Sequence, residues 1–250
     1  MAHKDILEEN RKEYFKKASF KQKMVYFWEY YKIHTFIILF LFISFAYLIN
    51  HFLTAKTSAI NGTFLNIDKI EGSASTQSLE EAFIERQDID SSKYEVRFND
   101  GYALTGDTSL DYETDQALWV QMNAGEIDFI VSPHEYVVNY GYQDYFYDLR
   151  TILSEDQLDK YESYFLYVDG KVIKEMNEQA LLPDAETKIE VPTATSPDEM
   201  EEPIPVFINL SSCEKIAQLY KSKYESLAFC IPASAKHLDM ALVFLDYVME

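Results

Sequence analysis

One short stretch of the chain places side chains of catalytic type directly after an apolar run. Ser132, His134 and Glu135 follow residues 127–131, Ile-Asp-Phe-Ile-Val, which predict a buried strand. Active sites of α/β proteins often lie at such strand ends, so an envelope hydrolase is one hypothesis. The alternative is structural, with Ser132 or His134 capping the next helix. Because no nucleophile elbow, phosphate loop or dinucleotide fingerprint is present, we predict no enzyme and no cofactor.

Two groups of acidic residues have spacings that raise the question of a metal site. Asp88, Asp90 and Ser92 resemble part of a calcium loop, but the central glycine and the terminal glutamate of such a loop are missing. The second group is interpreted as a solvated surface and consists of Asp107, Asp111, Glu113 and Asp115. No Cys/His spacing typical of zinc occurs, so the sequence predicts no metal site.

Tyrosines are enriched in one segment that also predicts a helix. Tyrosine rings stack on sugars and anchor protein interfaces. The alternative is that half of them pack the helix against a sheet and the rest form its amphipathic surface. The candidate partner or ligand surface consists of Tyr136, Tyr140, Tyr142, Tyr145 and Tyr147.

The chain has two cysteines, Cys213 and Cys230. Two cysteines are too few for a disulfide scaffold, so the stability of the fold must come from a packed core. Either a single Cys213–Cys230 disulfide forms, or both thiols are unpaired and buried. The sequence leaves these two alternatives open.

Residues 35–53 predict a transmembrane helix. None of these nineteen residues is charged, and at about 1.5 Å per residue they span roughly 28 Å, close to the thickness of a bilayer core. Five lysines precede the run within about twenty residues, and only Lys56 and Lys69 follow it within a similar distance. This asymmetry predicts a cytoplasmic N-terminus and an extracellular C-terminal domain on a signal anchor. A cleaved signal peptide is the competing interpretation, but it needs a shorter leader and a small-residue cleavage site.

Residues 1–34 predict a short basic cytoplasmic tail with a net charge of +3. Its apolar side chains recur at helical spacing at Phe20, Met24, Phe27 and Tyr31. We interpret this stripe as an interfacial helix that leads into the span. The alternative is a docking face for a membrane partner.

Residues 54–250 predict an acidic outer domain. They hold fourteen Lys/Arg and thirty-seven Asp/Glu, a net charge of −23. Such a domain repels phosphate backbones, so nucleic acid is excluded as a partner. The lipid bilayer is then a partner only through the N-terminal helix.

The outer domain alternates strand and helix patterns, which predicts an α/β layer. Strands are expected at 59–67, 94–99, 127–132, 205–210 and 226–231, and a hairpin at 165–168 and 171–174. Helices are expected at 76–86, 112–124, 135–140, 154–164, 211–224 and 235–249, with Gly125 ending the second. Residues 175–203 form a polar excursion with many prolines and acids.

Part of this pattern resembles a known family. The run Met-Asn-Ala-Gly-Glu-Ile-Asp-Phe-Ile-Val, followed by Tyr136, Gly141 and Asp148-Leu149, is similar to type II extracellular solute-binding proteins of transporters. The final strands and helix fit the same pattern. The resemblance implies a three-layer α/β lobe. Family members have two lobes that enclose a ligand, whereas here the excursion stands in place of the second lobe.

Together these observations predict a membrane-anchored accessory protein with one solute-binding-protein-like lobe. Its expected partner is a transporter or another envelope protein. The alternatives are a tethered solute receptor for a transporter and, less favoured by the motifs, the envelope hydrolase.

Overall fold

The computed structural model describes residues 16, 18–67, 75–107, 109–180, 191–192, 196–220 and 226–250. The chain divides into two compact units, Met1–Ala55 and Lys56–Glu250. The first unit contains a long apolar helix. The second contains a six-stranded sheet with helices, and we call it the α/β unit.

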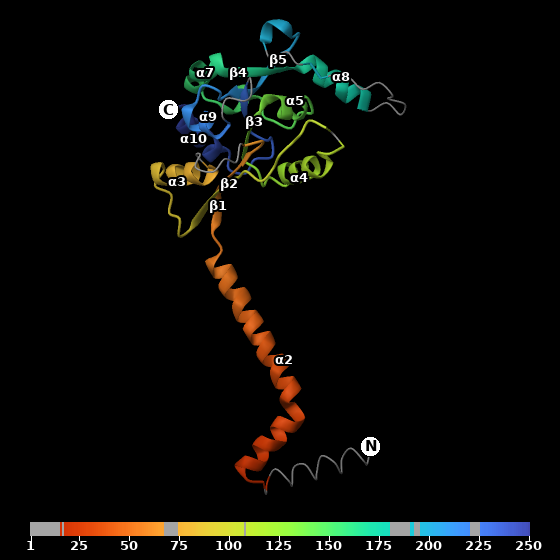
Figure 1. The fold of residues 1–250 in the computed structure, drawn as a ribbon, viewed down its shortest axis with the longest axis vertical. Coiled ribbons are helices and arrows are strands. Elements are labelled where there is room, and N and C mark those ends of the chain that lie inside the picture. The colour runs from red at the N-terminus through yellow and green to blue at the C-terminus, as the bar shows by residue number, and fades with distance from the viewer. Residues whose placement is uncertain are drawn as a thin grey trace. The chain divides into compact units, whose positions relative to one another are not determined.

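The long helix is α2, Phe20–Thr54, which appears in red to orange in Figure 1. It begins with a capping box, in which Ser19 and Gln22 satisfy each other's backbone N–H groups. Its segment Tyr31–Phe52 has a mean hydropathy of 2.1 and is apolar and long enough to cross a bilayer. The helix is therefore compatible with a membrane anchor or a signal sequence. The aromatic stripe predicted near Phe20 lies on this same continuous helix.

The α/β unit alternates strands and helices for most of its length. Its strands are β1 Thr57–Phe64, β2 Tyr94–Asn99, β3 Phe129–Pro133, β4 Phe165–Asp169, β5 Pro203–Asn209 and β6 Leu227–Cys230. Its α-helices are α3 Thr76–Arg86, α4 Tyr112–Asn123, α5 His134–Tyr142, α6 Leu149–Ile152, α7 Glu155–Tyr161, α8 Gly170–Ala180, α9 Glu214–Tyr220 and α10 Leu238–Met249. Two 3₁₀ turns, Glu162–Tyr164 and Pro197–Glu199, complete the described elements.

The sheet is mixed, with the strand order β2-β1-β3-β6-β5-β4. β1 pairs parallel with both β2 and β3, while β6 is antiparallel to β3 and β5. From β1 the chain moves one way along the sheet to β2 and then back past β1 to β3. Because parallel crossovers keep one hand, α3 and α4 fall on opposite faces. The predicted α/β fold class is confirmed at this level.

Phenylalanine side chains fill the face of the sheet that α3, α9 and α10 cover. Phe129 of β3 stacks on Phe244 of α10 at 4.3 Å between ring centroids and lies edge-on to Phe64 of β1. Phe83 of α3 meets the same Phe244 ring at 5.4 Å. We call this cluster the α3–α10 core. It joins the first and third strands to the last helix.

Smaller aliphatic side chains fill the opposite face, which α4 and α5 cover. Leu118 and Met122 of α4 and Val137 of α5 pack there against Ile130 and Phe207 of the sheet. We call this cluster the α4–α5 core. Figure 1 shows α4 and α5 on one side of the strands and α3, α9 and α10 on the other. Helices thus cover both faces of one sheet.

A buried carboxylate ties the end of α4 to the start of α10. Asp128 is fully buried and accepts four hydrogen bonds: from the backbone N–H groups of Asn61, Lys236 and His237, and from Nδ1 of the His237 ring. Just before it, Gly125 has a φ of +63° and closes α4, as predicted. A Cβ at Gly125 would lie 2.6 Å from the Ser234 carbonyl oxygen, so the close approach also requires glycine.

The predicted hairpin at 165–174 is wrong. Residues 165–169 form β4, but the chain then enters α8 instead of turning back. The Asp169 carboxylate accepts from the Lys171 N–H at the helix start and from the N–H groups of Glu201 and Glu202. Val172, Ile173 and Met176 recur at helical spacing and pack on the α4–α5 core, and this periodicity overrides the Asp-Gly turn signal.

The boundaries of the polar excursion and several caps also differ from expectation. Its first residues, up to 180, belong to α8, whereas 181–190 and 193–195 lie outside the described residues. Ser75 caps helix α3, its side chain accepting from the Ser78 N–H. Neither Ser132 nor His134 caps α5, which begins after Pro133 without a side-chain cap. α9 begins at Glu214 and α10 at Leu238, each three residues later than predicted.

We expect Phe129→Ala to lower the free energy of unfolding of the α/β unit by about 3–5 kcal/mol, because it opens a cavity among tightly packed rings. Urea denaturation of the full chain in mild detergent measures this loss. Tyr94→Ala, at a tyrosine that is 46% exposed, serves as the control and should change the value by less than about 0.5 kcal/mol. Equal stability of Phe129→Ala and the unsubstituted chain would contradict the packing described here.

Candidate functional site

The structure separates the five candidate tyrosines. Tyr142 is buried, and its hydroxyl accepts from the Asp169 N–H, so its assignment to a binding surface is wrong. Tyr147 is half-buried against the α3–α10 core, on the other side of the sheet from the rest. Tyr136, Tyr140 and Tyr145 are half-buried beside the α4–α5 core. Only these three share one region.

Two of these tyrosines form a closed chain of contacts with α4. The Tyr140 hydroxyl donates to the Asp115 carboxylate at 2.5 Å, and the Tyr140 and Tyr145 rings meet edge-on at 6.1 Å. The Tyr145 hydroxyl accepts a hydrogen bond from Nε1 of Trp119. Asp115 and Trp119 lie one turn apart on α4, so the four side chains close a ring between α4 and α5. We call them the α4–α5 tetrad.

The tetrad holds its aromatic groups in one fixed arrangement. Burial and the hydrogen bond to Asp115 both raise the pKa of Tyr140, so this hydroxyl keeps its proton and remains a donor. The indole of Trp119 is oriented by Tyr145 while remaining 48% exposed. A large aromatic surface is therefore fixed in position and open to solvent.

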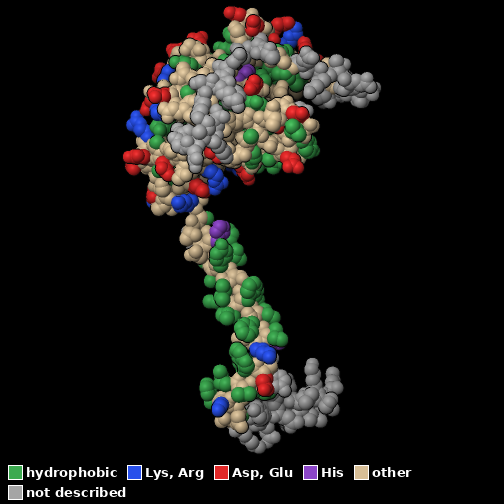
Figure 2. Space-filling view, viewed as in Figure 1, with side chains coloured by type: hydrophobic (Ala, Val, Ile, Leu, Met, Phe, Trp, Pro, Cys, Tyr) green, Lys and Arg blue, Asp and Glu red, His purple; other side chains and the backbone are tan. Residues whose placement is uncertain are grey.

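Other apolar side chains of α4 and its N-terminal approach are exposed near Trp119. Trp119 and Val120 lie seven and eight residues after Tyr112, so the three share one side of the helix. The exposed fractions are 72% for Leu110, 60% for Tyr112 and 56% for Val120. We call these four side chains the α4 face. Figure 2 shows hydrophobic and acidic side chains together over this part of the surface.

Sequence reasoning missed the α4 face. The sequence predicts this helix, but our interpretation of it assigned no inward-facing side to its apolar residues. The structure buries Leu118 and Met122 and exposes Trp119 and Val120 between them. A helical wheel anchored on Leu118 and Met122 would have placed Tyr112, Trp119 and Val120 outward.

The charge around the α4 face has one sign. Between Arg97 and Arg150 the sequence holds ten Asp/Glu and no Lys or Arg. This stretch builds the approach to α4, α4 itself, β3 and α5. The exposed acids of this stretch that lie outside β3 include Asp107, Glu113, Glu126, Glu135 and Asp144.

The acidic group predicted as a solvated surface is partly buried, so that interpretation is wrong for Asp111. Its carboxylate accepts from the Thr105 N–H and hydroxyl and from the Gly106 N–H. Desolvation acts to raise the pKa of Asp111, but these hydrogen bonds outweigh it and lower the pKa. Asp111 therefore shapes the loop before α4. Among the described residues, no cluster of three or more His, Cys, Asp or Glu side chains could hold a metal.

The same loop covers the carboxyl ends of the parallel strands. Asn66 follows β1 with a φ of 56°, and its side chain bonds both the N–H and the carbonyl of Leu104. Asn66 and Leu104 are both buried there. In open α/β sheets, ligands usually bind at the carboxyl ends of the strands, at the point where the strand order reverses. In this sheet that point lies between β1 and β3. Here the chain's own side chains occupy that edge.

The catalytic-type run after β3 does not form a nucleophile and base. The Ser132 hydroxyl donates to the neighbouring Pro133 carbonyl. The His134 ring is buried edge-on to Phe207, and its Nε2 has no hydrogen-bond partner among the described residues. Burial lowers the pKa of His134 to about 4, so the ring is neutral at pH 7.

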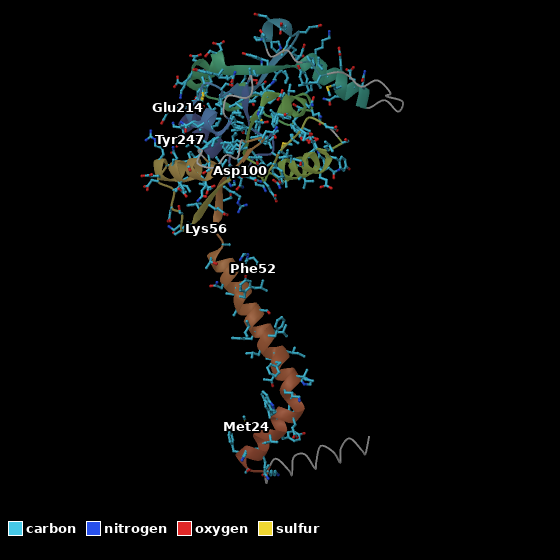
Figure 3. The ribbon with its side chains drawn as sticks, in the orientation of Figure 1. Met24, Phe52, Lys56, Asp100, Glu214 and Tyr247 are labelled. Carbon is cyan, nitrogen blue, oxygen red and sulfur yellow. The ribbon has the colours of Figure 1, made fainter. Side chains whose placement is uncertain are left out.

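Both cysteines are free buried thiols, so the disulfide alternative is not what the structure contains. Cys213 donates to the Met249 sulfur, while Cys230 belongs to the core on the other face of the sheet. Burial raises the pKa of each thiol, which makes both poor nucleophiles. A cavity of about 300 Å³ lies beside Cys213, between the start of α9 and the end of α10, and is lined by Glu214, which Figure 3 labels.

The run Asp88, Asp90 and Ser92, which resembles part of a calcium loop, forms a local turn. The Asp90 carboxylate accepts from the N–H and hydroxyl of Ser92 and pairs with Lys93. These bonds lower the pKa of Asp90 without any ion.

Comparison of the chain with protein-family models, curated proteins and solved structures found no match.

We expect acid to destabilise the α/β unit through His134. Its pKa is about 4 when folded and near 6.5 when unfolded, so between these values only the unfolded chain takes up the proton. Lowering the pH from 6.5 to 4 should therefore cost up to about 3 kcal/mol of stability from this residue alone.

Urea denaturation across this pH range measures the effect, and His134→Gln should lose distinctly less stability on acidification than the unsubstituted chain. The control His51→Gln replaces an exposed ring of α2 and should follow the unsubstituted chain. Identical pH dependence in all three would show that His134 is not held neutral.

Proposed function

We propose that the chain is a membrane-tethered binding module that docks an envelope protein on the α4 face. Trp119 carries this proposal: it is half-exposed, fixed by Tyr145 and surrounded by further exposed apolar side chains. Tryptophan and tyrosine held rigid at a surface are the side chains that contribute most to protein interfaces. A transporter subunit is one such partner, in keeping with the resemblance to solute-binding proteins.

A tethered solute receptor is the second candidate. The resemblance at residues 121–153 favours it, since family members bind solutes. Asn66 and Leu104 fill the edge where an α/β lobe usually receives a ligand, which weighs against it. A hydrolase has less support, because Ser132 bonds the adjacent backbone and both thiols have raised pKa values.

The membrane part of the proposal rests on α2. Its segment Tyr31–Phe52 is long and apolar enough to span, and lysines are concentrated on its N-terminal side. We propose that α2 is an uncleaved signal anchor with a cytoplasmic N-terminus. The α/β unit then faces the outside of the cell.

This orientation predicts which engineered cysteine a membrane-impermeant thiol reagent reaches in intact cells. Glu178→Cys, on the exposed side of α8, should be labelled, and Asn10→Cys should react only after the cells are lysed. The unsubstituted chain is the control, because its two thiols are buried. Labelling of Asn10→Cys but not Glu178→Cys in intact cells would reverse the proposed topology.

A photoreactive residue in place of Val120 tests the docking proposal directly. In cells it should give one discrete crosslinked protein, because Val120 lies beside Trp119 on the α4 face. The product should disappear when Tyr112 and Trp119 are both replaced by serine. The matched control is a photoreactive residue at Tyr94, which is similarly exposed but lies on the α3–α10 side of the sheet.

The proposal fails if both positions capture the same proteins, or if the double serine variant leaves the Val120 product unchanged. Circular dichroism of each variant establishes that the fold is retained.

A further inference from the structure

The α4 face combines exposed aromatic side chains with neighbouring sequence in which every charged side chain is acidic. Glu113 is exposed, follows Tyr112 directly and lies two helical turns before Val120, so its carboxylate is on the same side of α4 as Val120. The whole stretch between Arg97 and Arg150 adds only acids, and burial keeps His134 neutral. A partner that binds this face must therefore cover exposed apolar area and also offset negative charge.

Neighbouring positive charge does not cancel this field. Lys171 and Lys174 of α8, the helix that packs beside α5, pair at 2.5 Å with Glu201 and Glu202. Lys236 lies at the far end of α4, where its side chain packs by Gly125. Among the described residues, no Lys or Arg forms a salt bridge with the exposed acids near the apolar side chains of α4.

We propose that the α4 face recognises a protein segment that presents Lys or Arg beside an apolar side chain; this deepens the docking function proposed above and rests on it. The cation meets the acids and the open ring of Trp119, since aromatic faces attract cations. The apolar side chain meets Val120, which is exposed next to Trp119. Phosphate groups, nucleic acids and anionic lipid surfaces are repelled by the same field.

The tetrad supplies the rigidity that such recognition needs. Trp119 is held by Tyr145, Tyr145 packs on Tyr140, and Tyr140 is held by Asp115. A preordered indole loses little conformational entropy when a partner covers it. The site is therefore formed before the partner arrives.

The fluorescence of Trp119 can report whether a ligand is bound to the α4 face. The chain has two tryptophans, so Trp28→Phe leaves Trp119 as the only one. The full-length Trp28→Phe chain is placed in nanodiscs of zwitterionic lipid and titrated with a short amphipathic peptide of Lys and Leu. We expect a saturable blue shift of Trp119 emission, with affinity that falls about tenfold or more between low and high salt.

Four controls make the result specific. The same peptide with Glu in place of Lys should not bind, and empty nanodiscs should not take up the Lys peptide. Glu113→Lys should weaken binding by about tenfold, whereas Glu178→Lys on α8 makes the same change in net charge and should weaken it less than about twofold. A neutral oligosaccharide is the third ligand and should leave the emission unchanged.

The inference is overturned if the Glu peptide or the oligosaccharide binds as well as the Lys peptide, if Glu113→Lys and Glu178→Lys weaken binding equally, or if Trp119 emission does not respond. Each of these outcomes leaves the docking function intact when the Val120 crosslink is found. Loss of the Val120 crosslink, in contrast, removes the docking function itself.

Discussion

A single buried carboxylate constrains the layout of the α/β unit. An ionised side chain cannot stay in a protein interior unless donors satisfy it, and Asp128 obtains four of them. One donor comes from β1 and three from the segment before α10. The first strand and the last helix, which are distant in sequence, are thereby fixed to the end of α4. Phe129, the next residue, can then stack on Phe244 of that same last helix.

The same junction determines which side chains of α4 are exposed to solvent. Gly125 ends the helix with a positive φ, and the Ser234 hydroxyl donates to the Met122 carbonyl at this point. With its C-terminal end fixed in this way, α4 turns Leu118 and Met122 into the core and leaves Trp119 outside. The tetrad then fixes the middle of the helix to α5. A rigid aromatic surface is thus a consequence of how the core closes.

Sequence patterns predicted most of the elements and missed most of the site, for one physical reason. Periodicity and capping are local, so β2, α3, α4 and the glycine that ends α4 were placed correctly. Contacts such as Tyr140 with Asp115 depend on packing between helices, which no local pattern encodes. The burial of Tyr142 depends on the core in the same way. Helix α8 does have a local signal, the helical spacing of Val172, Ile173 and Met176, but it competes with the Asp-Gly turn signal at the same place.

The position of the buried loop bears on the proposal that the α/β unit binds a protein instead of a solute. The carboxyl edge at the β1–β3 reversal is the natural place for a small ligand, because backbone N–H groups and helix starts converge there. Asn66 uses that edge to bind Leu104, and Asp111 uses the N–H groups of Thr105 and Gly106. Donors that would have been available to a ligand are instead satisfied within the loop. The large exposed apolar side chains lie outward on α4 instead, as the proposed docking function requires.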